Sequence, residues 1–303
     1  MTKILGAILG ATGSGKTELA VLVAQKLNAE IICMDSRQVF KGFRIGTAQP
    51  CSEELKAVQH HLVDFLPPEK SYNAAEFAND VKKLLKETDK RFIIVGGTGL
   101  YLQALSLGLS PMPPSNPELR ESLKERYKNK AAELYSDALK ANPNIEGKIM
   151  PGDTQRLLRV LELMEIPTPP SAPLLGGEYT RIGGLGAISS VWLDFPRDEL
   201  YGRINERVAG MLKSGWVEEV QGLSETVPAD APAWQSLGYM ELRKVLEEGR
   251  EPLSIVEKVA QKSRNYAKRQ ITWFKHKEKP VYIDGKNAKS KDNLKKICEV
   301  FGA

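Results

Sequence analysis

One short segment constrains the fold of this chain more than any other. Residues 10–17 read GATGSGKT and match the pattern G-x-x-x-x-G-K-[ST]; an apolar run precedes them, and residues 17–27 have helical periodicity. A glycine-rich turn between a strand and a helix lets backbone N–H groups and the helix N-terminus surround phosphate oxygens. Lys16 would add a positive charge there, and the Thr17 hydroxyl could bind Mg²⁺. The motif therefore predicts a phosphate-binding loop, and it leaves the reaction open.

The apolar runs that follow indicate an α/β fold. Residues 30–34 form a second short run that ends at Asp35, and residues 91–95 form a third that ends in a glycine loop, Gly96–Gly99. Helical segments alternate with these runs, and strands that alternate with helices form a parallel sheet covered on both faces. We therefore predict the α/β class, with a P-loop NTPase-like parallel sheet as the core.

Two proline-rich segments, residues 111–117 and 167–173, interrupt this pattern as linkers do. Charged helical segments lie between them, and they are residues 118–128, 130–141 and 154–165. The sequence after the second linker returns to strand character, and from Glu199 onward it is mostly helical. We therefore predict a core domain of residues 1–111 and 187–303 and a helical insertion domain of residues 112–186.

Composition narrows the class of protein further. The net charge of +5 over 303 residues mildly favours an anionic partner. Three cysteines and three histidines are too few and too scattered for a disulfide framework or a metal site built from them. No apolar run approaches the roughly 18 residues of a membrane span. We therefore expect a cytoplasmic protein that does not span a membrane.

Two further features flank the expected phosphate site. Asp35 directly follows the second strand, so its carboxylate should face the crevice at the carboxyl end of the sheet. There it could bind Mg²⁺ through water, accept a proton from a nucleophile, or simply cap a turn. The loop Gly96–Gly99 ends the third strand, where it is either a second part of the site or a tight strand-to-helix turn.

Basic residues gather in two helical segments. Residues 258–279 hold eight Lys or Arg against a single Glu, interleaved with Tyr266, Trp273 and Phe274. A basic stripe with aromatic residues suits a phosphodiester backbone, although a solvated helix face would have the same pattern. The segment 155–159, QRLLR, adds two arginines to the insertion. Two separate basic helices favour a long polyanion over a mononucleotide.

Taken in order, these segments resemble the bacterial tRNA dimethylallyltransferases (tRNA isopentenyltransferases) over nearly the whole chain. The similarity lies in the segments Gly10–Thr17, Asp35–Phe40, Gly46–Ala48, Val95–Tyr101, Gln155–Arg159, Arg207–Gly215, Gln235–Tyr239 and Tyr266–Phe274. The resemblance implies a P-loop core with a helical insertion that embraces tRNA. It also implies transfer of a dimethylallyl group from dimethylallyl diphosphate to N6 of the adenine 3′ to the anticodon, with Mg²⁺ bound to the departing diphosphate. The adenine would have to flip out of the anticodon stem-loop, and a monomer is expected.

The resemblance also implies roles for individual residues. Catalytic roles fall to Asp35 as the base, to Thr98, and to Arg207, which counters the charge on the diphosphate. The residues implied to bind diphosphate are Gly10, Thr12, Gly13, Ser14, Gly15, Lys16 and Thr17, of which Thr17 also holds the metal. The residues expected to contact tRNA are Asp35, Ser36, Arg37, Gln38, Thr98, Gln155, Arg156, Arg159, Lys268 and Arg269.

The chain departs from the family pattern at two points. Ala11 stands where the family usually has proline, and residues 149–153 lack the His and Asn expected there. The first change leaves the backbone cradle intact, and the second puts a local contact of the insertion in doubt. Three alternatives remain: an adenylate isopentenyltransferase, a P-loop small-molecule kinase, and a non-catalytic RNA-binding module. An adenylate isopentenyltransferase or a small-molecule kinase has no use for two basic helices. An RNA-binding module does not explain why Lys16, Thr17 and Asp35 are placed around one crevice.

Overall fold

The computed structural model describes residues 3–109, 112–113, 115–165 and 182–302. The chain divides into two compact units, one formed by Met1–Ser106 with Leu185–Ala303 and the other by Leu107–Gly184. Each unit has its own buried apolar cluster. Among the described residues, no helix combines the length and the apolar character that crossing a membrane requires.

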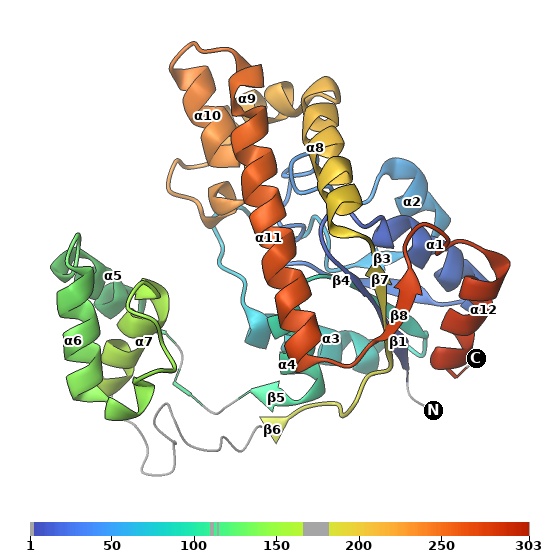
Figure 1. Cartoon of the computed structure of the whole chain (residues 1–303), viewed down its shortest axis with the longest axis horizontal. Helices are drawn as coiled ribbons and strands as arrows, with labels where there is room; N and C mark the ends of the chain where they lie inside the picture. The colour runs from blue at the N-terminus through green and yellow to red at the C-terminus, as the bar shows by residue number, and fades with distance from the viewer. Residues whose placement is uncertain (1–2, 110–111, 114, 166–181, 303) are drawn as a thin grey trace. The chain divides into compact units, whose positions relative to one another are not determined.

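A six-stranded sheet forms the centre of the larger unit (Figure 1). Its strands, in spatial order, are β3 (His60–His61), β2 (Glu30–Met34), β4 (Phe92–Gly96), β1 (Ile4–Gly10), β7 (Ser190–Asp194) and β8 (Val281–Asp284). Every neighbouring pair is parallel. The central strands are buried on both faces, which explains why their sequences are continuous apolar runs. The predicted α/β fold class is confirmed, although β3 and β8 had not been predicted.

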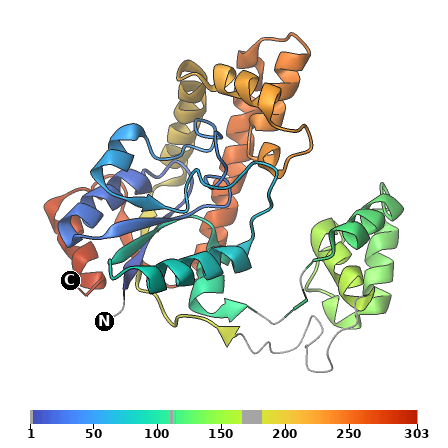
Figure 2. The ribbon, with the colours of Figure 1, turned by 180° about the vertical axis from the view of Figure 1, so that it is seen from behind.

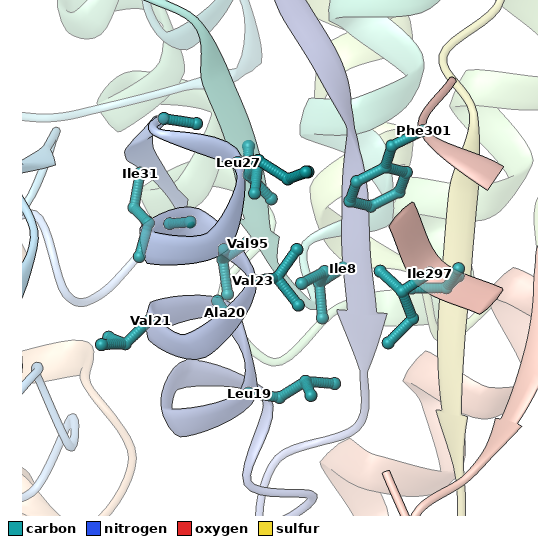
Figure 3. Close-up of a cluster of buried hydrophobic side chains, with 14 of the residues drawn as sticks. Ile8, Leu19, Ala20, Val21, Val23, Leu27, Ile31, Val95, Ile297 and Phe301 are labelled. Carbon is teal, nitrogen blue, oxygen red and sulfur yellow. The ribbon is translucent and has the colours of Figure 1, made fainter. Parts of the chain in front are cut away.

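Helices cover both faces of this sheet. On one face, α1 (Lys16–Leu27) and α12 (Lys291–Val300) pack against alternate residues of the strands, with Ile8, Val95 and Ile297 in the same apolar cluster (Figure 3). On the other face, Trp192 of β7 contacts Phe274 of α11 (Val256–Lys277) with ring centroids 5.0 Å apart. The helices α3 (Ala74–Glu87) and α4 (Gly99–Ser106) pack together there (Figure 2).

A second apolar cluster lies beyond the carboxyl end of the sheet. It is built around Phe43, Trp216, Trp234 and Tyr239, which are all buried. The helical elements that supply it are α8 (Arg197–Lys213), α9 (Trp216–Thr226), η2 (Pro232–Gln235), α10 (Tyr239–Glu247), η3 (Pro252–Ile255) and α11. The short helix α2 (Ser52–Ala57) packs against α1 instead. This cluster supports the loop of residues 35–49, which follows β2, from the side away from the sheet.

In the part that the structure describes, the smaller unit is built from three α-helices. Its elements are β5 (Gly108–Leu109), α5 (Pro117–Arg126), α6 (Ala131–Ala141), η1 (Pro143–Ile145), α7 (Thr154–Glu165) and β6 (Ile182–Gly183), and β5 pairs antiparallel with β6. Leu123, Leu134 and Leu157 share its apolar core. The three helices coincide with the three predicted helical segments to within a few residues. The predicted linker at 167–173 lies outside the described residues.

Gly96 of β4 lies very close to the backbone of the neighbouring strand β2. A Cβ atom at this position would lie 2.0 Å from the backbone oxygen of Met34 on the adjacent strand. We expect Gly96→Ala to lower the free energy of unfolding by about 1–3 kcal/mol because backbone cannot move aside as a side chain can. Gly222 on α9 has open space around it, so Gly222→Ala should instead stabilise the protein by about 0.5–1 kcal/mol. Thermal unfolding of both variants checks this, and an unchanged Gly96→Ala midpoint would contradict it.

Candidate active site

The phosphate-binding motif forms a tight turn from the end of β1 into the start of α1. Gly13 and Gly15 have φ angles of 83° and 78°, a left-handed conformation that side chains disfavour. Gly15 is the residue that caps the N-terminus of α1. The first N–H groups of this helix have no partners within the helix, and its dipole places partial positive charge at the same end. The predicted loop thus has the geometry of an anion cradle.

A cavity of about 700 Å³ opens beside this turn at the carboxyl end of the sheet. Its polar lining includes Thr12, Gly13, Gly15, Lys16, Thr17, Asp35, Arg37, Gln38, Arg203, Arg207, Tyr266 and Gln270. The cavity therefore brings together most of the predicted diphosphate residues, two of the predicted catalytic residues and part of the predicted tRNA set. Gly10 and Ser14 lie behind it, where the Ser14 side chain is buried.

Three cations face the turn. Burial, with a smaller contribution from the positive charge of Arg207, lowers the pKa of Lys16 to about 8, and the negative charge of Asp35 opposes this shift. Arg207 donates from Nη1 to the Thr12 hydroxyl at 2.8 Å, and burial also lowers its pKa. Arg203 donates from Nε to the Gly13 carbonyl at 3.0 Å. Unlike Arg207, Arg203 had not been predicted as a site residue, although it precedes Arg207 by one helical turn.

Asp35 lies at the end of β2 and lines the same cavity. Its Oδ1 accepts the backbone N–H groups of Arg37 at 2.8 Å and Gln38 at 3.2 Å. These two bonds orient the carboxylate and cap the turn after the strand. The second oxygen accepts no hydrogen bond from the residues that the structure describes, so it is available to a ligand.

The side chains of Arg37 and Gln38 contact the protein itself. The Gln38 side chain donates to the carbonyls of Thr47 at 3.2 Å and Ala48 at 2.6 Å, and Arg37 donates from Nη1 to the Pro232 carbonyl at 3.3 Å. These bonds shape the loop that forms one wall of the cavity. Ser36, between them and Asp35, is partly exposed.

The second glycine loop follows β4 and lies beside the first. Thr98 in this loop is close to Tyr266 of α11. Burial and then the negative charge of Asp35 raise the pKa of Tyr266 to about 12, while the Thr98 hydroxyl opposes the shift. Tyr266 is therefore a neutral phenol, and it lines the same cavity as Asp35.

Gln270 of α11 bridges the two glycine loops. Its Oε1 accepts the backbone N–H of Thr12 at 2.8 Å, and its Nε2 donates to the Gly97 carbonyl at 3.0 Å. Sequence reasoning had not predicted this residue as part of the site. The available signal was a polar side chain among Ala267 and Phe274, which form the buried side of the helix.

The cavity has an apolar end. Its lining there consists of Val208, Met211, Trp216, Leu237 and Val259, which all belong to the apolar cluster beyond the sheet or pack against it. Ile204 of α8 also lines the cavity, but it lies beside Gly13 of the phosphate-binding turn. The residues come from α8, the start of α9, the segment before α10 and α11, which explains why no local sequence pattern marks them as one surface. A ligand that combines an anionic group with a short hydrocarbon would match both ends of the cavity.

The predicted RNA-contact residues outside the cavity fall on both units. Lys268 and Arg269 are exposed on α11, and the Arg269 guanidinium lies 5.6 Å from the Tyr266 ring centroid. Gln155 and Arg156 are exposed on α7 of the smaller unit. Arg159 is different, because it pairs at 3.0 Å with Glu162, a fully buried carboxylate, and donates to the Pro113 carbonyl. The Arg159 side chain thus has a structural role in the smaller unit.

Among the described residues, no three His, Cys, Asp or Glu side chains gather as a metal site. The cavity lining includes oxygen donors, among them the Thr17 hydroxyl, which suit Mg²⁺, a hard cation that takes its remaining ligands from water and from substrate phosphates. The donor set therefore fits a magnesium ion that binds together with an anionic substrate.

Comparison with known proteins places the chain in a family. The sequence model of the family described as IPP transferase matches residues 38–277. The tRNA dimethylallyltransferase of Chloroherpeton thalassium is 40% identical over 288 residues, which cover 91% of this chain and 88% of that protein. The crystal structure of a tRNA isopentenylpyrophosphate transferase from Staphylococcus epidermidis has a TM-score of 0.67 at 33% identity and covers 99% of this chain and 98% of its own. That from Bacillus halodurans has a TM-score of 0.68 at 29% identity, with 99% and 95% covered. These matches confirm the resemblance drawn from the motifs: the chain belongs to the IPP transferase family, the family of the tRNA dimethylallyltransferases.

Proposed function

We propose that the protein transfers a dimethylallyl group from dimethylallyl diphosphate to N6 of the adenine 3′-adjacent to the anticodon in tRNA. The observation that carries this proposal is the pairing, within one cavity, of a phosphate cradle with a carboxylate that has a free oxygen. The cradle would hold the diphosphate, and Asp35 would face the acceptor nitrogen. The relative from Chloroherpeton thalassium is by name a tRNA dimethylallyltransferase.

The cations of the cavity would stabilise the leaving diphosphate. Negative charge grows on its bridging oxygen as the bond to the dimethylallyl carbon breaks. Arg207 and Arg203 are already oriented by hydrogen bonds to the turn, so they need no reorganisation as that charge develops, and Lys16 adds its charge beside them. The amides at the start of α1 would bind the remaining phosphate oxygens.

Magnesium fits the same end of the cavity. The Thr17 hydroxyl would hold it, and water and the diphosphate oxygens would supply its remaining ligands. When bound, Mg²⁺ supplies positive charge to the diphosphate oxygens. The protein's own part is to present Thr17 on the first turn of α1, next to Lys16.

Asp35 would serve as the general base. The bonds from Arg37 and Gln38 hold one carboxylate oxygen, which leaves the other to accept the N6 proton as the new carbon–nitrogen bond forms. The proton would remain on Asp35 until the product leaves. Thr98, beside Tyr266, would orient the acceptor base by hydrogen bonding. The apolar end of the cavity would receive the dimethylallyl chain and exclude water from a reactive carbon.

The exposed basic residues would bind the tRNA backbone. Lys268 and Arg269 on α11 and Arg156 on α7 are exposed and suited to phosphate contacts. Gln155 lies beside Arg156, and we propose that the helical insertion embraces the anticodon stem-loop through this part of α7. The side chains of Arg37, Gln38 and Arg159 are engaged within the protein, so we propose that they shape the binding surface.

A transfer assay tests the proposed function directly. Purified protein is incubated with radiolabelled dimethylallyl diphosphate and Mg²⁺, with unmodified tRNA in one reaction and AMP in another. We expect label in tRNA alone. Label in AMP alone would replace the proposal with an adenylate isopentenyltransferase, and label in neither would return the P-loop to an ATP-dependent kinase.

The Asp35→Asn variant tests the base. The amide oxygen can still accept the two backbone hydrogen bonds, so the turn should survive while the capacity to take a proton is lost. We expect kcat for transfer to tRNA to fall by about 10²–10⁴-fold, with little change in tRNA affinity. Asp230→Asn, at an exposed position, is the control and should retain native kcat. A kcat for Asp35→Asn within a few-fold of native would remove Asp35 from this role.

The lowered pKa of Lys16 predicts a pH dependence of diphosphate binding. Because this pKa is about 8, the free protein loses the Lys16 charge as pH rises through that value. A bound anion favours the protonated form, so affinity should be fully present below about pH 8 and fall by up to roughly tenfold per pH unit above it. Calorimetric titration with inorganic diphosphate, at constant Mg²⁺, measures this. In the Lys16→Met variant, the pH dependence of affinity that remains comes from the titration of diphosphate itself. Identical pH profiles of affinity for the native protein and this variant would contradict the prediction.

The basic residues of α11 predict a salt-dependent interaction with tRNA. Replacing Lys268 and Arg269 by alanine should weaken tRNA binding and reduce the slope of log K against log salt by about one for each lost phosphate contact. The double variant Lys291→Ala and Lys295→Ala removes the same charge from exposed positions on α12 and is the control. Filter binding over a range of salt concentrations distinguishes them. Equal slopes for the two double variants would exclude α11 as a contact surface.

A further inference from the structure

Gln270 is a buried polar side chain that connects three parts of the site. It is 5% exposed and lies on the side of α11 that packs against the sheet. Its carboxamide accepts from the Thr12 amide and donates to the Gly97 carbonyl, at 2.8 and 3.0 Å. The P-loop, the second glycine loop and α11 are therefore joined through one functional group.

The chemistry of this bridge requires an amide. One partner is a donor and the other an acceptor, and a glutamine side chain offers an oxygen and an NH₂ group in one plane. An apolar side chain would leave both backbone groups without a partner in a buried place, which is costly. The fit is also close, because a Cβ atom at Gly97 would lie 2.2 Å from Nε2 of Gln270. The carboxamide and the backbone oxygen of Gly10, 2.9 Å from the same point, together leave room only for glycine here.

The two loops carry different parts of the proposed reaction. On the first, the Thr12 hydroxyl accepts from Arg207, which faces the diphosphate site. On the second, Thr98 directly follows Gly97 and lies beside Tyr266, where the acceptor base would be held. The Thr12 amide already donates to Gln270, so in this arrangement it is not available to a phosphate oxygen.

Resting on the transfer reaction proposed above, we propose that Gln270 is a positioning residue. It sets the separation between the diphosphate cradle and the groups that orient the attacking adenine. Reaction rates depend steeply on this separation, since a misplacement of about 1 Å can cost about 10²-fold. Binding of either substrate alone depends on it much less, because each substrate contacts mainly one loop.

The Gln270→Leu variant separates positioning from stability. We expect kcat for dimethylallyl transfer to fall by about 10–100-fold, while the dissociation constants of tRNA and of inorganic diphosphate change by less than about threefold. Ile297→Ala, in the apolar cluster beneath α12, is the stability control. It should lower the melting temperature at least as much and leave kcat within about twofold of native.

The Gln270→Glu variant adds a readout that a purely structural role would not produce. A neutral carboxylic acid has one donor and one acceptor and reproduces the bridge, whereas a carboxylate can only accept. The ratio of its kcat to native kcat should therefore rise as pH falls, by at least about tenfold from pH 8.5 to 6. Lys16, Asp35, Arg207 and Tyr266 line the same cavity and are present in both proteins, so the ratio removes the part of their titration that both proteins share.

The outcomes distinguish the positioning role from the proposed function. Native kcat in Gln270→Leu, or a loss no larger than that of Ile297→Ala, overturns the positioning role while the native protein still modifies tRNA. A pH-independent ratio for Gln270→Glu overturns it as well. Absence of transfer by the native protein overturns the proposed function, and the positioning role with it. A selective loss of kcat together with the pH-dependent rescue supports both.

Discussion

The site depends on cations that the fold gathers at a single turn. Lys16, Arg207 and Arg203 converge on the turn between β1 and α1, and Asp35 is one of the carboxylates that line the same cavity. Burial lowers the pKa of both Lys16 and Arg207, which means that their charged forms are incompletely solvated. An anionic ligand would stabilise these two charged side chains in place of the water that burial removes. Folding has already brought these charges together, so the binding of diphosphate does not have to supply the free energy for that step.

Buried hydrogen bonds hold the walls of the cavity in place. Gln38 and Gln270 play parallel parts, since each uses a carboxamide to fasten loops that have no regular structure of their own. Asp35 does the same for its own turn with one oxygen and keeps the other free. The groups proposed to react are therefore attached to loops, and the precision of those loops comes from a few side chains that do not react. Rigid support of this kind is what a transfer between two bound substrates requires.

The two compact units divide the proposed work. The larger unit contains the whole cavity, whereas the smaller one has an independent apolar core and exposes Gln155 and Arg156 on α7. Within the smaller unit, Glu162 gathers Arg159 and Arg120 around a fully buried carboxylate. Such an arrangement ties α5 to α7, and removing one partner would leave charge buried without compensation. An arginine close to an RNA-contact position can thus be essential for the shape of the surface without touching RNA.

The amino-acid sequence by itself determined the features that depend on neighbouring residues. The P-loop, the place of Asp35 after a strand, the three helices of the smaller unit and the α/β class all follow from periodicity, glycine positions and local order. The order of the motifs along the chain also identified the family, and the comparisons confirmed it. Only the tertiary structure decided which distant side chains meet. It paired Gln270 with Thr12, 258 positions away, assembled the apolar end of the cavity from α8 and α11, and committed Arg159 to Glu162. Contacts of this kind arise from packing between elements, and packing depends on complementary surfaces that no local pattern in the chain records.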